Sequence, residues 1–313
     1  MNERSPQAVP PASSSTGPSV APPGSPSTAP PGSSPAAMSA PPVTPRAAEA
    51  ASGAFVVRPG LWALAFLRVL LRMTWIEIKL LIREPVTLVF SFAFPVLVLV
   101  LLGGIFGGQR MDSGAYAGLK MMNWYVPSYI GLVVASIGTV SLPVHLSTYR
   151  ERGVLRRFRA SGVSEWALLG SQFLVGVCTC LLGALFVSVL GIFAYGVVAP
   201  VSIGGVAVAF VVAVFAFSAI GVLIASLAPT ARAAQGIGLL IWFIMMFISG
   251  TSAPLDQLPH WMVTLARALP LYHVVISLVD PWNGHGSNPL QLTIVAGIGL
   301  ATTLLATGLF QWE

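Results

Sequence analysis

Charge is what this 313-residue chain has least of. Only 8% of its residues are charged and 55% are hydrophobic, whereas soluble domains carry roughly 25% charged residues. With a mean hydropathy of +0.83, the chain has too few charges to cover a surface that faces water. The composition therefore excludes an ordinary soluble protein and predicts one that is integral to a membrane.

Several catalytic and binding motifs are also missing. Neither lysine follows a glycine, so the sequence GxxxxGK[ST] of a nucleotide-binding P-loop does not occur. The patterns HExxH and GxSxG are absent, and the histidines lack the paired spacing of metal ligands. Cys178 and Cys180, two residues apart, would point to nearly opposite sides of a helix, which makes a mutual disulfide improbable. We therefore predict no enzyme activity, bound cofactor or metal site in this chain.

The N-terminal segment has a composition of its own. Residues 1–54 hold thirteen of the 25 prolines, interleaved with serine, alanine and glycine. Such a segment cannot bury apolar surface, and it has no apolar centre like that of a signal peptide. We predict a disordered cytoplasmic tail at 1–54 and a single transmembrane domain at 55–313.

Residues 61–84 are amphipathic, with cations punctuating an apolar stretch. A helix carrying this many charges is costly inside a bilayer, at roughly 2.5–3.5 kcal/mol for each central Arg or Lys. In the plane of the interface the cations reach the headgroups. The sequence predicts an interfacial helix here, ended by Pro85. Its cations are Arg68, Arg72, Lys79 and Arg83.

Six further segments approach the twenty or so apolar residues that cross a bilayer. The first has a kink position at Pro95 and a glycine-rich end that permits close helix packing. The third is longer than one straight span needs, and the fifth is short. The predicted spans are residues 86–106, 126–146, 166–198, 203–227, 233–249 and 290–310.

The region between the fifth and sixth spans is rich in proline. A polar run at 250–260 is followed by two apolar pieces, 261–269 and 271–279, which Pro270 separates. Each piece is too short to span, so the sequence predicts interfacial or re-entrant helices. Asp280-Pro281 and the following Asn-Gly pair are typical turn dipeptides and predict a turn there.

Basic residues set the predicted orientation. With six spans, thirteen of the 16 Lys and Arg residues fall on the side of the N-terminus, and three fall on the other side. Because cytoplasmic loops carry the excess of cations, both termini are predicted to be cytoplasmic. The positive charge is explained by this topology, so we predict no nucleic-acid partner.

One polar stretch, residues 149–162, carries five of the 16 cations. Read as a helix, Arg152, Arg156 and Arg159 share one stripe, and apolar side chains occupy another side. Such a helix lies on a membrane surface or docks in the groove of a partner. A plain basic loop that orients its neighbours is the simpler interpretation, and the two are compatible.

The chain thus combines many spans with a cytoplasmic docking segment and no motor. An ion-gradient-driven carrier is an alternative, but such carriers keep carboxylates or histidines near mid-membrane, and these spans hold almost none. His145, at the cytoplasmic end of the second span, is predicted to be interfacial rather than a proton relay. A membrane scaffold without transport activity is a third possibility. A permease that needs an external ATPase fits the pattern best.

Three stretches resemble the permease subunits of type-2 ABC exporters. IKLLIREP at 78–85, running into FPVL at 94–97, is similar to the elbow helix and first span of that family. RERGVLRRFRA at 150–160 resembles the family pattern ERERGTLxRLRATPLS, with Val154 in the place of threonine. PLDQLP at 254–259 with PLYH at 270–273 resembles the segment before the last span.

The resemblance implies a pair of six-span permease subunits, identical or different, above two cytoplasmic ABC ATPases that hold ATP and Mg²⁺. It implies export of a hydrophobic or amphipathic substrate across the cell membrane, as in antibiotic-efflux and in polysaccharide or lipid export permeases. The implied ATPase-coupling residues are Glu151, Arg152, Gly153, Leu155, Arg156, Phe158 and Arg159. The implied elbow residues are Lys79, Arg83, Glu84 and Pro85, and the implied outer re-entrant residues are Pro254, Leu258, Pro259 and Pro270.

Overall fold

Helices make up almost all of the regular structure in the described residues. The computed structural model describes Trp75, Lys79 and residues 89–112, 116–154 and 165–309, all within the unit Val57–Glu313. The predicted tail at 1–54 lies outside them. The helices are η1 (Val89–Ala93), α4 (Phe94–Phe106), α5 (Met121–Ser136), η2 (Ile137–Ser141), α6 (Leu142–Glu151), α8 (Glu165–Tyr195), α9 (Ile203–Leu227), α10 (Ala231–Ile248), η3 (Leu255–Gln257), α11 (His260–Ala266), α12 (Pro270–Trp282) and α13 (Pro289–Leu309).

Five helices are long and apolar enough to cross a membrane, and the bent pair α11–α12 provides a sixth if it counts as one span. The predicted all-α membrane architecture is confirmed at this level. Four predicted spans match α8, α9, α10 and α13 to within three residues at each end. The predicted first span is described only from Val89, where η1 and α4 form a shorter apolar run.

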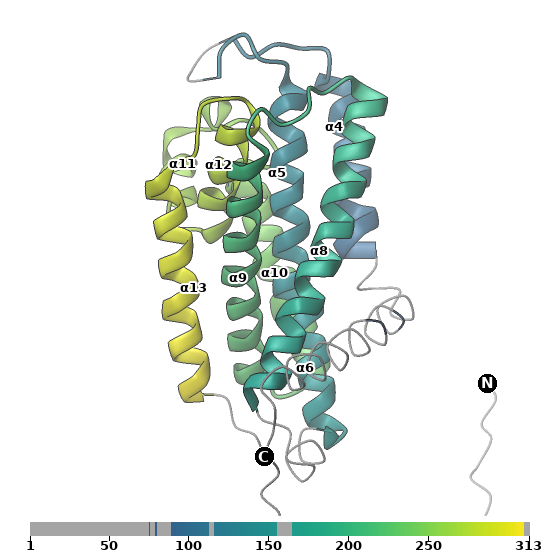
Figure 1. The fold of residues 1–313 in the computed structure, drawn as a ribbon, viewed down its shortest axis with the longest axis vertical. Coiled ribbons are helices and arrows are strands. Elements are labelled where there is room, and N and C mark those ends of the chain that lie inside the picture. Colours follow the sequence, from purple (N-terminus) through teal and green to yellow (C-terminus); the bar gives the residue numbers. More distant parts are fainter. Residues whose placement is uncertain (1–74, 76–78, 80–88, 113–115, 155–164, 310–313) are drawn as a thin grey trace, which may run out of the picture. The chain divides into compact units, whose positions relative to one another are not determined.

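The central helix of the bundle is the continuous run Met121–Glu151, formed by α5, η2 and α6 (Figure 1). Protein covers 94% of its apolar window, whereas the other four long helices are 22–50% covered. Its surroundings are therefore other helices rather than lipid. The sequence prediction for this span, 126–146, is too short at both ends, because hydropathy alone does not distinguish a helix in lipid from a helix in protein.

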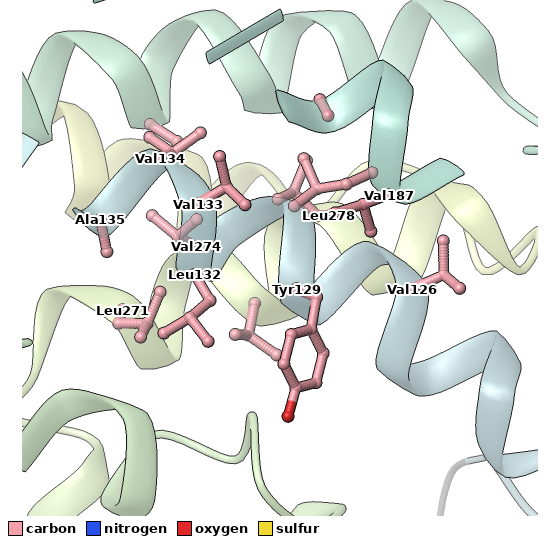
Figure 2. Packing of buried hydrophobic residues seen from close by; sticks show 14 of the residues in the cluster. Val126, Tyr129, Leu132, Val133, Val134, Ala135, Val187, Leu271, Val274 and Leu278 are labelled. Carbon is pink, nitrogen blue, oxygen red and sulfur yellow. The ribbon is translucent and has the colours of Figure 1, made fainter. Parts of the chain in front are cut away.

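Close packing between α5 and α12 forms part of the core. Leu271, Val274 and Leu278 from α12 lie across Gly131 of α5, within 3.6 Å of where its Cβ would be. Figure 2 shows these side chains beside those of α5, including Tyr129. Small residues at such positions let helix backbones approach closely in a membrane.

The outer helices, unlike the buried central helix, carry large apolar side chains that are exposed. Phe193 of α8 and Leu304 of α13 are 85% and 75% exposed. A soluble domain rarely displays many large apolar side chains together. Here they line helices of spanning length, so lipid is their expected solvent.

Two helical runs contain a wide π-turn immediately before a proline. η1 ends at Ala93, with Pro95 at the start of α4, and η2 ends at Ser141, with Pro143 at the start of α6. Proline has no N–H, and its ring pushes away the carbonyl four residues earlier. A π-turn widens the backbone locally, so the helix continues past the proline. The predicted kink position at Pro95 is thus a change of helix type, and the central helix extends well beyond Pro143.

The π-turn η2 leaves two carbonyl groups without their usual helical donors. The N–H of Leu142 donates to Ile137, five residues back, so Gly138 loses that donor. Pro143 has no N–H to donate to Thr139. Both open carbonyls lie in the middle of the central helix.

Glycines on the neighbouring helices meet these carbonyls. A Cβ on Gly221 of α9 would lie 2.2 Å from the Gly138 oxygen, and one on Gly238 of α10 would lie 2.0 Å from the Thr139 oxygen. Only hydrogen fits at these positions, so the Cα atoms of the two glycines lie in close contact with the two carbonyl oxygens. The central helix therefore touches α9 and α10 backbone to backbone.

Candidate coupling site at the end of the central helix

The central helix ends in a tight turn at the start of the arginine-rich stretch. The N–H of Arg152 donates to Thr148 O at 3.0 Å, and that of Gly153 donates to Arg150 O at 3.1 Å. Gly153 has a φ of +65°, a left-handed conformation that glycine adopts at little cost. Gly153, one of the implied coupling residues, therefore forms the turn that ends the central helix. α6 ends at Glu151 and Val154 is helical again, so any helix formed by the arginine-rich stretch begins after this turn; residues 155–162 lie outside the described residues.

Arg150 caps the C-terminus of α9. Its Nη1 donates to Ala225 O at 3.0 Å, and its Nη2 donates to Ala228 O. Ala225 needs such a donor, because Pro229, four residues later, has no N–H. A cation is also favoured by the negative end of the helix dipole.

Glu151 caps the N-terminus of α10. Its Oε1 accepts from the backbone N–H of Ala231 at 2.8 Å. The Thr230 hydroxyl accepts from Ala233 N at 3.1 Å in the same first turn. Two of the orphan donors that begin every helix are thus satisfied, and an anion is favoured at this positive end.

Apolar contacts support the same junction. α6 packs against both α9 and α10. A small buried cluster lies between α6 and the end of α9, below the main core. Its members are Leu142, Leu146 and Ala225, with Val222 packed against them.

Of the other predicted coupling and elbow residues, the structure describes two, and the rest lie outside the described residues. Arg152 is exposed beside the turn. Lys79 is helical and exposed, with its ammonium 5.4 Å from the centroid of the Trp75 ring. The remaining ones lie outside the described residues: Leu155, Arg156, Phe158, Arg159, Arg83, Glu84 and Pro85.

The opposite end of the bundle holds the predicted re-entrant region (Figure 1). α11 and α12 are bent by 94° at the break between them. Pro259 precedes α11 at its N-cap and Pro270 begins α12, where a missing N–H costs least. Pro254 is buried before η3, and Leu258 is half-buried after it. A sharply bent pair of short helices, as the sequence predicts, is present.

Asp280 corrects one prediction in this region. Asp280 and Pro281 lie inside α12 rather than in a turn, and the chain turns only at Gly284, with φ +86°. The Asp280 carboxylate is buried and accepts from the Tyr116 hydroxyl and from Asn288 Nδ2. Tertiary partners on both sides thus hold this residue in the helix, where its dipeptide preference alone predicts a turn.

Two hollows lie in the half of the bundle nearer the end of α6. His145 lines a small cavity of about 30 Å³ with Gln172 and is only 8% exposed, so its ring is covered by protein. A groove of about 290 Å³ runs between α8, α9 and α13. Its walls are largely apolar, and Phe173 and Phe215 are among the lining residues.

Comparison with protein families decides what kind of bundle this is. The profile of the ABC-2 type transporter family matches residues 68–280, well over half of the chain. The chain belongs to the ABC-2 type transporter family. A search of curated proteins found no match.

As an ABC-2 transporter membrane domain, the chain is a transport permease with several spanning helices. The family match begins in the predicted elbow segment and ends at Asp280 in α12. It therefore includes the central helix, the turn at Gly153 and the bent pair, whereas α13 lies beyond it. The family resemblance predicted from the three stretches is confirmed.

Sequence reasoning about this ABC-2 permease missed Arg150 as a site residue. The available signal was the group Ala228-Pro229-Thr230, since a proline after a long apolar run removes a donor and a threonine begins the next helix. Those features predict a carbonyl in need of a donor. They do not say which distant cation supplies it.

Proposed function

We propose that this chain is the permease subunit of an ATP-driven exporter, powered by a separate cytoplasmic ATPase. The observation that carries the proposal is the turn at Gly153, which ends the buried central helix and leads directly into the arginine-rich segment. A helix enclosed by the other spans, with a docking segment at its end, is suited to pass movement from a motor into the bundle. Since the sequence has no P-loop, ATP and Mg²⁺ belong to the partner.

In this proposal the segment after Gly153 seats in a cleft of the ATPase. Leu155 and Phe158 fill the cleft, and Arg152, Arg156 and Arg159 face acidic rims or lipid headgroups. The permease has six spans and an interfacial elbow, pairs with a second permease copy, and lies in the plasma or inner membrane with both termini cytoplasmic. The apolar groove between α8, α9 and α13 supports a hydrophobic or amphipathic cargo.

Co-purification with the ATPase tests the docking assignment. Leu155→Asp puts a charge into the proposed apolar contact and is expected to abolish co-purification while the permease still inserts. Gly153→Pro, which cannot adopt a φ of +65°, is expected to do the same. Ala199→Asp, at an exposed loop residue, is the matched control and leaves assembly unchanged. Normal assembly of the Leu155 and Gly153 variants refutes the assignment.

Orientation is tested by labelling single cysteines in a background without Cys178 and Cys180. A cysteine at Ser287, exposed after α12, is expected to react with an impermeant maleimide in intact cells. A cysteine at Arg232, exposed in α10, is expected to react only after permeabilisation. The reverse pattern contradicts the proposed topology.

A gradient-driven carrier is separated from this proposal by its energy source. Flux of a lipophilic cationic dye through vesicles that contain permease and ATPase is expected to require ATP and to survive an uncoupler. Flux that persists without ATP and collapses with the uncoupler identifies a secondary carrier instead.

A further inference from the structure

The last turn of α6 carries two neighbouring charges that both bind backbone within this chain. We propose that Arg150 and Glu151 are positioning residues, forming a clamp that joins the tip of the central helix to the α9–α10 hairpin. Through it, movement of the arginine-rich segment reaches α9 and α10 as one body. The clamp consists of these two side chains and their backbone partners Ala225, Ala228 and Ala231. Its role in transport rests on the proposed function.

The hairpin offers the clamp two complementary sets of unpaired backbone groups. The end of α9 presents carbonyl oxygens, one of them deprived of its donor by Pro229. The start of α10 presents an N–H at Ala231 that has no partner within its own helix. The carbonyl oxygens that lack donors and the N–H that lacks an acceptor lie only a few residues apart in the chain, at the short link between the helices.

Each side chain of the clamp has the charge that suits its backbone partner, a cation for the carbonyl oxygens of α9 and an anion for the N–H of α10. The guanidinium of Arg150 has a planar fork of donors, and it spans two carbonyl groups of α9. The carboxylate of Glu151, the next residue, accepts at 2.8 Å from the first N–H of α10. Each charge also faces the helix end that attracts it. The two side chains therefore bind two different helices, Arg150 the end of α9 and Glu151 the start of α10, rather than each other.

The geometry extends the clamp's effect across the bundle. The same two helices touch the central helix again at η2, through Gly221 of α9 and Gly238 of α10. α9 packs along α13, and α10 leads to the bent pair at the opposite end. Tied at its tip and at its middle, the central helix cannot shift without taking the hairpin with it.

Reversing both charges separates the clamp from alternatives. The double variant R150E/E151R conserves net charge and would preserve a mutual ion pair, yet it puts each charge at the wrong helix end. In the full-length permease, hydrogen exchange of the Ala231 amide is expected to rise about tenfold, as for the loss of a charge-assisted hydrogen bond. Arg150→Lys leaves the Glu151 acceptor in place and is expected to match wild type at the Ala231 amide, as is Arg152→Ala, at the exposed neighbour. Unchanged exchange in R150E/E151R overturns the clamp.

Spin-label distances in the permease–ATPase complex test the transmission of movement. One label pair joins Thr148, half-buried near the end of α6, to Ser287, and the other joins Arg232 to Ser287, in a background without native cysteines. Vanadate trapping with MgATP is expected to shift both distances in the native clamp. The clamp assigns Glu151 to the start of α10 and not to the ATPase contact. In R150E/E151R the ATPase is therefore expected to co-purify and the first distance to shift, whereas the second no longer does.

Each other result of that experiment refutes a definite part of the scheme. An equal shift of the Arg232–Ser287 distance in R150E/E151R overturns the clamp as the route of transmission. No shift of either pair in the native complex overturns the proposed function, and with it the role of the clamp in transport. The exchange experiment uses the permease alone, so it still decides whether the clamp joins the helices.

Discussion

The contact between Gly238 and the central helix makes the sharpest prediction about stability. In Gly238→Ala the new Cβ would lie 2.0 Å from the Thr139 oxygen, whereas Cα–H···O contacts place carbon and oxygen about 3.3–3.6 Å apart. The two helices must then separate by roughly 1.3 Å. Neither partner is a flexible side chain, so we expect the upper part of the range for overpacking, about 2–3 kcal/mol. For a unit of this size that corresponds to about 4–12 °C in the midpoint of thermal unfolding.

Fluorescence-detected size exclusion of heated, detergent-solubilised permease measures that midpoint. Gly236→Ala is the matched control, because it lies on the same helix with nothing within 4 Å of the new Cβ. The control is expected to equal or exceed wild type, since alanine favours a helix by about 1 kcal/mol over glycine. Equal midpoints for the two variants would refute the backbone contact between α10 and η2.

Two further substitutions test single buried hydrogen bonds. Trp242→Phe removes the indole N–H that donates to Leu132 O at 3.2 Å in the core. Because Leu132 lies inside α5, its carbonyl keeps the helical donor at Ser136, so the loss of this second bond should cost about 0.5–1.5 kcal/mol, and an unchanged thermal midpoint contradicts this. Tyr116→Phe removes the hydroxyl that donates to the buried carboxylate of Asp280, which should loosen the loop after α4 and speed tryptic cleavage after the exposed Arg110. Cleavage at the wild-type rate shows that this bond does not hold the loop.

Hydropathy predicted the lipid-facing helices well and the central helix poorly. The ends of α9 coincide with the predicted span 203–227, because an apolar run bounded by polar residues or proline is visible in the sequence. The central helix continues from Met121 to Glu151 and so includes polar residues that a search for apolar runs leaves out. Neighbouring helices bury the start of this helix at Met121 and Met122, and at its end Arg150 and Glu151 bind the ends of α9 and α10.

Predictions from short sequence preferences are wrong where contacts with distant residues determine the backbone conformation. The Asp280-Pro281 pair favours a turn in isolation, yet Tyr116 and Asn288 bind the carboxylate within α12. The turn at Gly153 was predictable, because only the identity of one residue is involved. The partners of Arg150 were not, because they lie more than seventy residues away in the sequence. Spacing within one helix carries no information about such a contact.

The open carbonyls of η2 have a mechanical consequence. A helix resists bending through its ladder of hydrogen bonds, and at Gly138 and Thr139 that ladder lacks two rungs. Stiffness at this depth is therefore supplied from outside, by the glycines of α9 and α10. Bending the central helix at this depth would therefore also move it away from the glycines of α9 and α10. The bending stiffness of the central helix at η2 thus depends on its contacts with α9 and α10. A movement that separates the α9–α10 hairpin from the central helix would also make that helix easier to bend.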